Sequence, residues 1–139
     1  MAGYSQTPLA KKLGIKEGFR VALINAPRNF EATLSGMPDN VKFITRAAKE
    51  LDLIVLFVST ERVLATDFSK FAARLVANGM IWIAWPKKSS GVETNLTFDR
   101  VQKIGLAAGL VDVKICAIDE IWSGLKFVYR VKDRAARQH

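Results

Sequence analysis

Short apolar runs, separated by polar segments with glycine or proline, predict the secondary structure of this chain. Three of the runs are apolar at nearly every position, which is typical of strands buried on both faces of a parallel sheet. Elsewhere, apolar residues recur at spacings of three and four, as in helices that cover a sheet. The expected strands span residues 19–25, 53–58, 80–85, 111–118 and 122–131; the expected helices span 9–13, 60–77 and 97–108, with a short helical piece at 30–34.

Residues 41–46 carry two conflicting patterns. Val41, Phe43 and Thr45 alternate with polar residues as in a strand. Apolar residues from Phe43 to Leu51 would also form one face of a helix. We expect a short strand that runs into a helical turn.

The order of the elements predicts an α/β protein. Strand–helix–strand units are followed by two strands with only a tight turn between them, which makes that pair antiparallel. The expected fold is a three-layer Rossmann-like sandwich, whose mostly parallel sheet ends in an antiparallel hairpin. This layout resembles the class I methyltransferase fold. The length of 139 residues fits a single domain over 1–139, with a short basic tail at about 132–139.

A ligand of such a sheet binds beyond the carboxyl ends of the strands. The fold would bring together there the segments 25–27, 59–61, 85–91 and 119–120, together with Trp122. From these segments we select as candidate ligand-binding residues Asn25, Lys87, Lys88, Ser89, Ser90, Asp119, Glu120 and Trp122.

The loop at 87–91 is the most suggestive of these segments. Its two ammonium groups and two hydroxyls could hold a phosphate or a carboxylate, although a solvated connection between strand and helix is the favoured explanation. Asp119 and Glu120 could form an acid–base pair or serve as polar turn residues. Trp122 could stack on a base or fill the rim of the core.

The turn after the first strand argues against the usual binding of dinucleotides or S-adenosylmethionine. That binding needs glycines, so that the backbone can approach the cofactor. Here the turn reads Asn25-Ala26-Pro27 and has no glycine, and Pro27 lacks a backbone donor. We therefore assign no cofactor.

Composition and charge narrow the choice of partner. Half of the residues are hydrophobic and the formal net charge is +8, which would suit an anionic partner. Residues 1–20 hold four basic residues against one acidic, and residues 130–139 hold the same balance, so the body of the chain is nearly neutral. Nucleic acid is therefore a less favoured partner than a small anionic ligand.

Several chemistries lack the residues they require. The only histidine, His139, is terminal and the only cysteine is Cys116, so we expect neither a metal site nor a His-dependent catalytic triad. Cys116 lies within an expected strand as a buried thiol. No apolar run reaches the ~18 residues of a membrane span, and no signal peptide is visible, which favours the cytoplasm.

Three stretches together resemble a bacterial family known only as domain of unknown function 3052. They are residues 2–15, residues 85–97 with Trp85-Pro86-Lys87-Lys88-Ser89-Ser90-Gly91, and residues 109–126 with Asp119-Glu120 and Trp122-Ser123-Gly124. The Asn-Ala-Pro turn at 25–27 also agrees with this family. The resemblance implies a small bacterial cytoplasmic protein, and it assigns no reaction to any residue.

These observations leave the function open between three classes. The first is a domain that binds a small anionic ligand at the carboxyl ends of the strands. The alternatives are a methyltransferase-like enzyme with atypical cofactor binding, and a nucleic-acid-associated protein that uses its basic termini.

Overall fold

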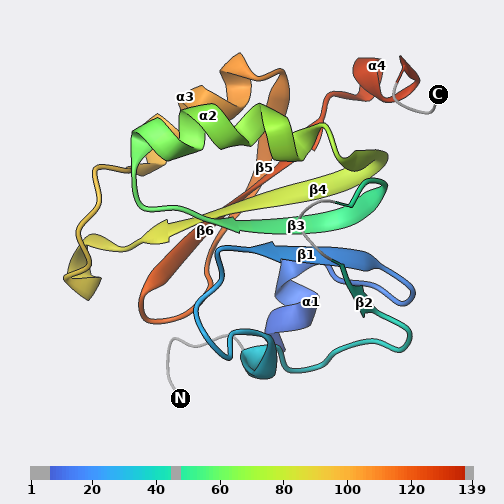
Figure 1. Cartoon of the computed structure of the whole chain (residues 1–139), viewed down its shortest axis with the longest axis horizontal. Coiled ribbons are helices and arrows are strands. Elements are labelled where there is room, and N and C mark those ends of the chain that lie inside the picture. The colour runs from blue at the N-terminus through green and yellow to red at the C-terminus, as the bar shows by residue number, and fades with distance from the viewer. Residues whose placement is uncertain (1–6, 45–47, 137–139) are drawn as a thin grey trace.

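Six strands form one mixed sheet with helices on both of its faces (Figure 1). The computed structural model describes residues 7–44 and 48–136. Within these ranges the elements are α1 (Leu9–Leu13), β1 (Arg20–Ile24), η1 (Glu31–Thr33), β2 (Lys42–Phe43), β3 (Leu51–Phe57), α2 (Glu61–Ala72), β4 (Leu75–Pro86), η2 (Lys88–Ser90), α3 (Phe98–Ala107), β5 (Leu110–Ala117), β6 (Trp122–Tyr129) and α4 (Val131–Arg134).

The strand order is β2-β1-β3-β4-β6-β5. The first four strands are parallel, whereas β6 runs antiparallel to both β4 and β5. This arrangement confirms the three-layer α/β fold with a terminal hairpin. No helix in the described ranges is both long and apolar enough to pass through a bilayer.

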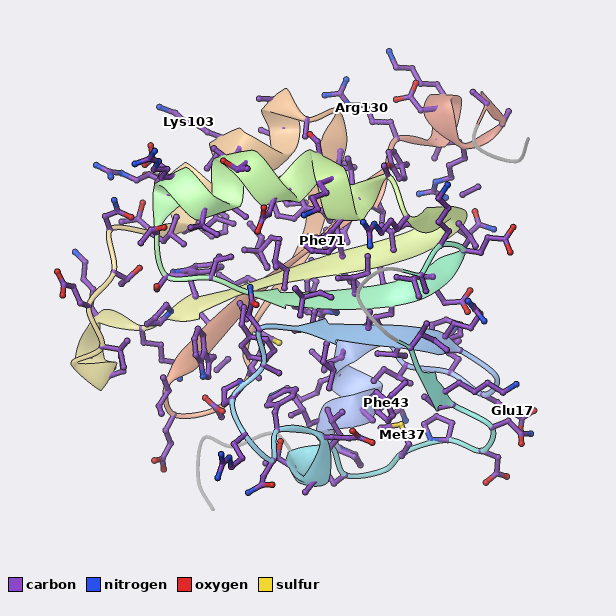
Figure 2. The ribbon with its side chains drawn as sticks, viewed as in Figure 1. Glu17, Met37, Phe43, Phe71, Lys103 and Arg130 are labelled. Carbon is purple, nitrogen blue, oxygen red and sulfur yellow. The ribbon has the colours of Figure 1, made fainter. Side chains whose placement is uncertain are left out.

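Burial on both faces fixes the layers around the central strands. Every side chain of residues 53–57 and 81–85 is buried. On one face α2 and α3 cover them, and Figure 2 shows Phe71 of α2 directed into this core. On the other face α1 and the segments around η1 and β2 form the cover, where Met37 and Phe43 lie (Figure 2).

The close packing of α3 on the sheet depends on Gly105. A Cβ atom at this position would overlap the ring of Phe127 on β6. The same ring makes an edge-on contact with Phe68 of α2, with 5.1 Å between the ring centroids. Val101 and Gly105 are buried on the inner face of α3, and Ile104 and Ala108 pack against the core beside them.

The helix expected over 60–77 is too long, and the expected strand at 80–85 is too short. The structure ends α2 at Ala72 and begins β4 at Leu75. Leu75 pairs with Leu51 of β3, and the backbone N–H of Leu51 donates to the carbonyl of Arg74 at 2.9 Å. A buried leucine three residues after Ala72 fits a helical stripe as well as a strand, so periodicity alone placed it in the wrong element.

Part of the ambiguous segment 41–46 is now settled. Lys42 and Phe43 form β2, which pairs with Arg20 and Val21 of β1. The short strand is therefore confirmed. The helical turn predicted after it reaches into residues 45–47, which lie outside the described residues.

We expect Gly105→Ala to destabilise the fold by about 1–3 kcal/mol, because the added methyl group would overpack the contact between α3 and β6. The measurement is chemical denaturation followed by circular dichroism. The matched control repeats the substitution in a Phe127→Leu background, where the smaller side chain leaves room for the methyl group. An equal cost of Gly105→Ala in both backgrounds would contradict this explanation.

Candidate functional site

The chain leaves β1 and β3 in opposite directions. From β1 it runs through η1, on the α1 face, to β2 at the edge of the sheet; from β3 it runs through α2, on the other face, to β4. Neighbouring parallel strands whose connections diverge in this way leave a crevice between their carboxyl ends. The topology therefore places the candidate site between the ends of β1 and β3.

A cavity of about 320 Å³ lies at this point. We call it the switch-point cavity. Its lining combines apolar and aromatic side chains with two hydroxyls and one amide, a mixture typical of sites for small organic ligands. The lining residues are Asn25, Phe57, Val58, Ser59, Thr60, Val63 and Trp122.

Asn25 forms the turn directly after β1. Its φ of 59° is left-handed, a conformation that glycine adopts freely and that asparagine tolerates better than most residues. Asn25 thus meets the backbone requirement of a glycine turn, although its side chain occupies space that glycine would leave open. Within the described part of the chain its exposed amide group has no hydrogen-bonding partner.

Ser59 and Thr60 join β3 to α2. The hydroxyl of Thr60 caps α2 by accepting from the backbone N–H of Val63 at 3.2 Å. The carbonyl of Ser59 accepts from the hydroxyl of Thr94 at 2.6 Å, which fixes the backbone at this position. Since the described residues offer no partner to the Ser59 hydroxyl, this group is available to a ligand.

Trp122, at the start of β6, supplies an aromatic wall. Its ring meets Phe57 edge-on at 5.0 Å between centroids, and Phe57 in turn meets Phe30 at 4.9 Å. This chain of aromatic contacts holds the partly exposed tryptophan in place. A planar ligand group could stack on such a wall.

A second cavity, of about 590 Å³, adjoins the first through Ser59 and Thr60. Its other lining residues are Val92, Glu93, Thr94 and Asn95. The side-chain carbonyl of Asn95 accepts from the backbone N–H of Glu61 at 2.8 Å, so this loop is tied to the start of α2.

The switch-point cavity contains no ionisable side chain in its lining. Nor do the described residues contain a group of three or more His, Cys, Asp or Glu side chains placed to hold a metal ion. The cavity can therefore bind and orient a ligand by shape, stacking and neutral hydrogen bonds, but its lining has no group to accept a proton.

Of the predicted site residues, only Asn25 and Trp122 line the switch-point cavity. Lys88, Ser89 and Ser90 form η2, and Lys87 precedes it. The Ser90 hydroxyl donates to the carbonyl of Lys87 at 2.6 Å and accepts from the backbone N–H of Val92, so it serves the turn itself. An anion site at Lys87, Lys88, Ser89 and Ser90 stays a prediction.

Asp119 organises the turn between β5 and β6. One of its carboxylate oxygens accepts from the backbone N–H groups of Ile121 and Trp122, each at 2.8 Å. Glu120 beside it is exposed. This geometry fits the interpretation of Asp119 and Glu120 as turn residues. It gives Asp119 an indirect role in the site, because its carboxylate fixes the backbone at Trp122.

The remaining lining residues were not among the selected candidates. The sequence placed residues 59–61 at the correct edge, but nothing distinguished Ser59 from its neighbours. Phe57 and Val63 belong to patterns that also serve the core and the helix surface. The useful signal was position alone: the first polar residue after a strand buried on both faces.

Comparisons with known proteins support this assignment of the fold. The chain is similar to Aeropyrum pernix fibrillarin with natively bound S-adenosyl-L-methionine (TM-score 0.57, 16% identity, 91% of this chain and 70% of that one). It is also similar to magnesium protoporphyrin IX methyltransferase from Synechocystis with the same cofactor bound (TM-score 0.59, 8% identity, 88% of this chain and 74% of that one). A third similar structure is precorrin-6y C5,15-methyltransferase from Geobacter metallireducens (TM-score 0.60, 9% identity, 88% of this chain and 86% of that one).

The chain has a methyltransferase-like Rossmann fold. At these identities the likeness concerns the fold alone. No protein-family model and no curated protein matches the sequence.

We expect Asp119→Ala to lower the free energy of unfolding by about 1 kcal/mol, because two backbone donors in the turn lose their acceptor. Asp119→Asn keeps an acceptor oxygen and should cost clearly less. Glu120→Ala is the matched control and should leave stability unchanged. Equal stability of the Asp119→Ala variant and the wild type in thermal denaturation would contradict the structural role.

Proposed function

We propose that this chain is a methyltransferase-like protein that binds S-adenosylmethionine, or a nucleoside of the same kind, in an atypical way. The observation that carries the proposal is the position of the switch-point cavity. It lies between the carboxyl ends of β1 and β3, where this class of sheet binds its ligands. The solved structures of the same fold that contain S-adenosylmethionine support this choice of ligand.

The lining fits the nucleoside part of such a ligand. Trp122 offers an aromatic surface for the base, and the Ser59 hydroxyl and the Asn25 amide offer hydrogen bonds to ribose hydroxyls. The binding is atypical because Asn25 and Pro27 replace the glycine-rich turn, so the ligand must contact side chains more than backbone at β1. S-Adenosylmethionine, when bound, supplies an electrophilic methyl group.

The chain's own contribution to catalysis is positioning. The lining of the switch-point cavity has no proton acceptor, so its residues serve to hold the methyl donor in line with the acceptor, and Glu93 of the adjoining cavity is the one carboxylate in either lining. The adjoining cavity beside Thr94 and Asn95 is open to that acceptor, because it meets the switch-point cavity at Ser59 and Thr60.

The direct test is isothermal titration with S-adenosylmethionine and S-adenosylhomocysteine. We expect binding to the wild type, and a loss of about fivefold in affinity for Asn25→Gly, which removes the amide but keeps the left-handed turn. Asn40→Gly is the matched control, because Asn40 also has a positive φ, of 61°, but lies before β2 and outside the cavity lining. Its affinity should equal that of the wild type.

Trp122→Leu gives a second variant, which should weaken binding by removing the stacking surface. Two results would overturn the proposal: no binding of either compound to the wild type at millimolar concentration, or binding that neither Asn25→Gly nor Trp122→Leu weakens. Methyl transfer to any acceptor, measured with a labelled methyl group, would extend the proposal from binding to catalysis.

A further inference from the structure

Three lysines from distant parts of the sequence meet on the α1 face of the terminal hairpin. Lys12 belongs to α1, Lys114 to β5 and Lys126 to β6. The ammonium of Lys12 donates to the carbonyl of Ala117, and that of Lys114 donates to the carbonyl of Lys12, both at 3.3 Å. We call this set the lysine face. It lies on the hairpin and shares no residue with the lining of the switch-point cavity.

The hairpin sets two of these like charges against each other. Lys114 and Lys126 are directly opposed across the two strands, an arrangement that normally destabilises a sheet. Lys126 also lies over the ring of Trp82, with its ammonium 5.7 Å from the ring centroid. Trp82 lies beneath this face, and its indole N–H donates to the carbonyl of Leu13 at 2.8 Å.

No carboxylate of the described residues forms an ion pair with these ammonium groups. The one ion pair in that part of the chain joins Arg100 to Glu61, and it involves none of these lysines. Lys114 donates to a carbonyl of the last turn of α1 and Lys126 lies over the ring of Trp82, but neither contact supplies a full negative charge. The face therefore concentrates positive charge without a counter-ion of its own.

Cys116 lies among these charges, and it is only partly buried rather than the buried thiol expected from the sequence. Burial raises the pKa of its thiol, and the ammonium groups of Lys12, Lys114 and Lys126 act in the opposite direction. Burial also lowers the pKa of Lys126, and the neighbouring Lys114 and Lys16 add to that effect. Lys114 thus opposes the charge of Lys126 across the hairpin, and a bound anion would relieve that repulsion.

We propose that Lys12, Lys114 and Lys126 form a binding site for a compact phosphate-type anion. Lys114 and Lys126 are paired across the hairpin and Lys114 also reaches α1 at Lys12, and so short a set of point charges suits a single phosphate or pyrophosphate group better than an extended polyanion. Such a group could be free or could belong to a phosphorylated small molecule. The site is independent of the proposed function, because it shares no lining residue with the switch-point cavity.

Cys116 provides a local reporter, since it is the only cysteine of the chain. The test measures its alkylation by iodoacetamide, a neutral reagent, at about pH 8, where reactivity follows the thiolate fraction. Bound pyrophosphate neutralises the nearby ammonium groups and therefore disfavours the thiolate. We expect millimolar pyrophosphate to slow alkylation about threefold, and sodium chloride at the same ionic strength to slow it less.

Lys114→Met combined with Lys126→Met should abolish this response. Lys87→Met combined with Lys88→Met removes the same charge from the loop at 87–91 and should preserve the response. The proposal is overturned if pyrophosphate leaves the rate unchanged, if sodium chloride reproduces the effect in full, or if the response survives in the Lys114 and Lys126 variant. Slower alkylation with inorganic phosphate alone would show that one phosphate group suffices.

Thermal denaturation separates a ligand site from a purely structural role. Without anion, Lys114→Met should raise Tm by about 2–4 °C, because it removes one of two opposed charges. With pyrophosphate, the wild type should gain Tm and the variant should not. A lower Tm for Lys114→Met, together with no anion effect on the wild type, would show that the lysine only caps α1.

A single-stranded oligonucleotide is the competing polyanion. If it binds more tightly than pyrophosphate and loses that binding in the Lys114 and Lys126 variant, the compact-anion proposal is wrong. Failure of these tests leaves the proposed function untouched, since titration with S-adenosylmethionine reports on the other site.

Discussion

The burial of β3 and β4 on both faces is the constraint on which the rest of the structure depends. Their central side chains have no access to water on either side of the sheet, so each face needs its own layer of cover. On one face α2 and α3 provide it, and Gly105 lets α3 approach β6 closely. On the other face the five-residue α1 and irregular segments provide a thinner cover (Figure 1).

Both candidate sites lie where this cover of the sheet ends. The connections from β1 and β3 depart to opposite faces, and the switch-point cavity remains between them. Its walls are held by core contacts, because Phe57 is buried and Trp122 packs against it. The short helix α1 contacts the hairpin only through its last turn. Lys12, Lys114 and Lys126 therefore meet there, at the border between core and solvent.

Much of the fold was predictable, because apolar runs buried on both faces have few alternative structures. The central parallel strand followed from such a run, whereas the hairpin followed from the tight turn between the last two strands. The end of α2 did not, since Leu75 fits both a helical stripe and the strand that it begins. The positive φ of Asn25 was also hidden, because asparagine adopts both signs of φ and nothing in the turn sequence fixes the choice.

The candidate site was predictable in position but only partly in its residues. Asn25 and Trp122 were correctly placed at the edge of the sheet. The conformation of the loop at 87–91 could not be predicted, because it depends on hydrogen bonds that Ser90 makes within its own turn. The lysine face was missed because Lys12 is about a hundred positions from its neighbours. Only the register of the hairpin, which sets Lys114 opposite Lys126, could have indicated part of it.

Hydrogen–deuterium exchange with and without S-adenosylhomocysteine tests the central claim, that the crevice between β1 and β3 is the ligand site. We predict slower exchange in two segments, residues 25–29 after β1 and residues 59–63 around the start of α2, and unchanged exchange over residues 88–91, which contain η2. Protection confined to residues 88–91, or no protection at all at saturating ligand, would contradict it.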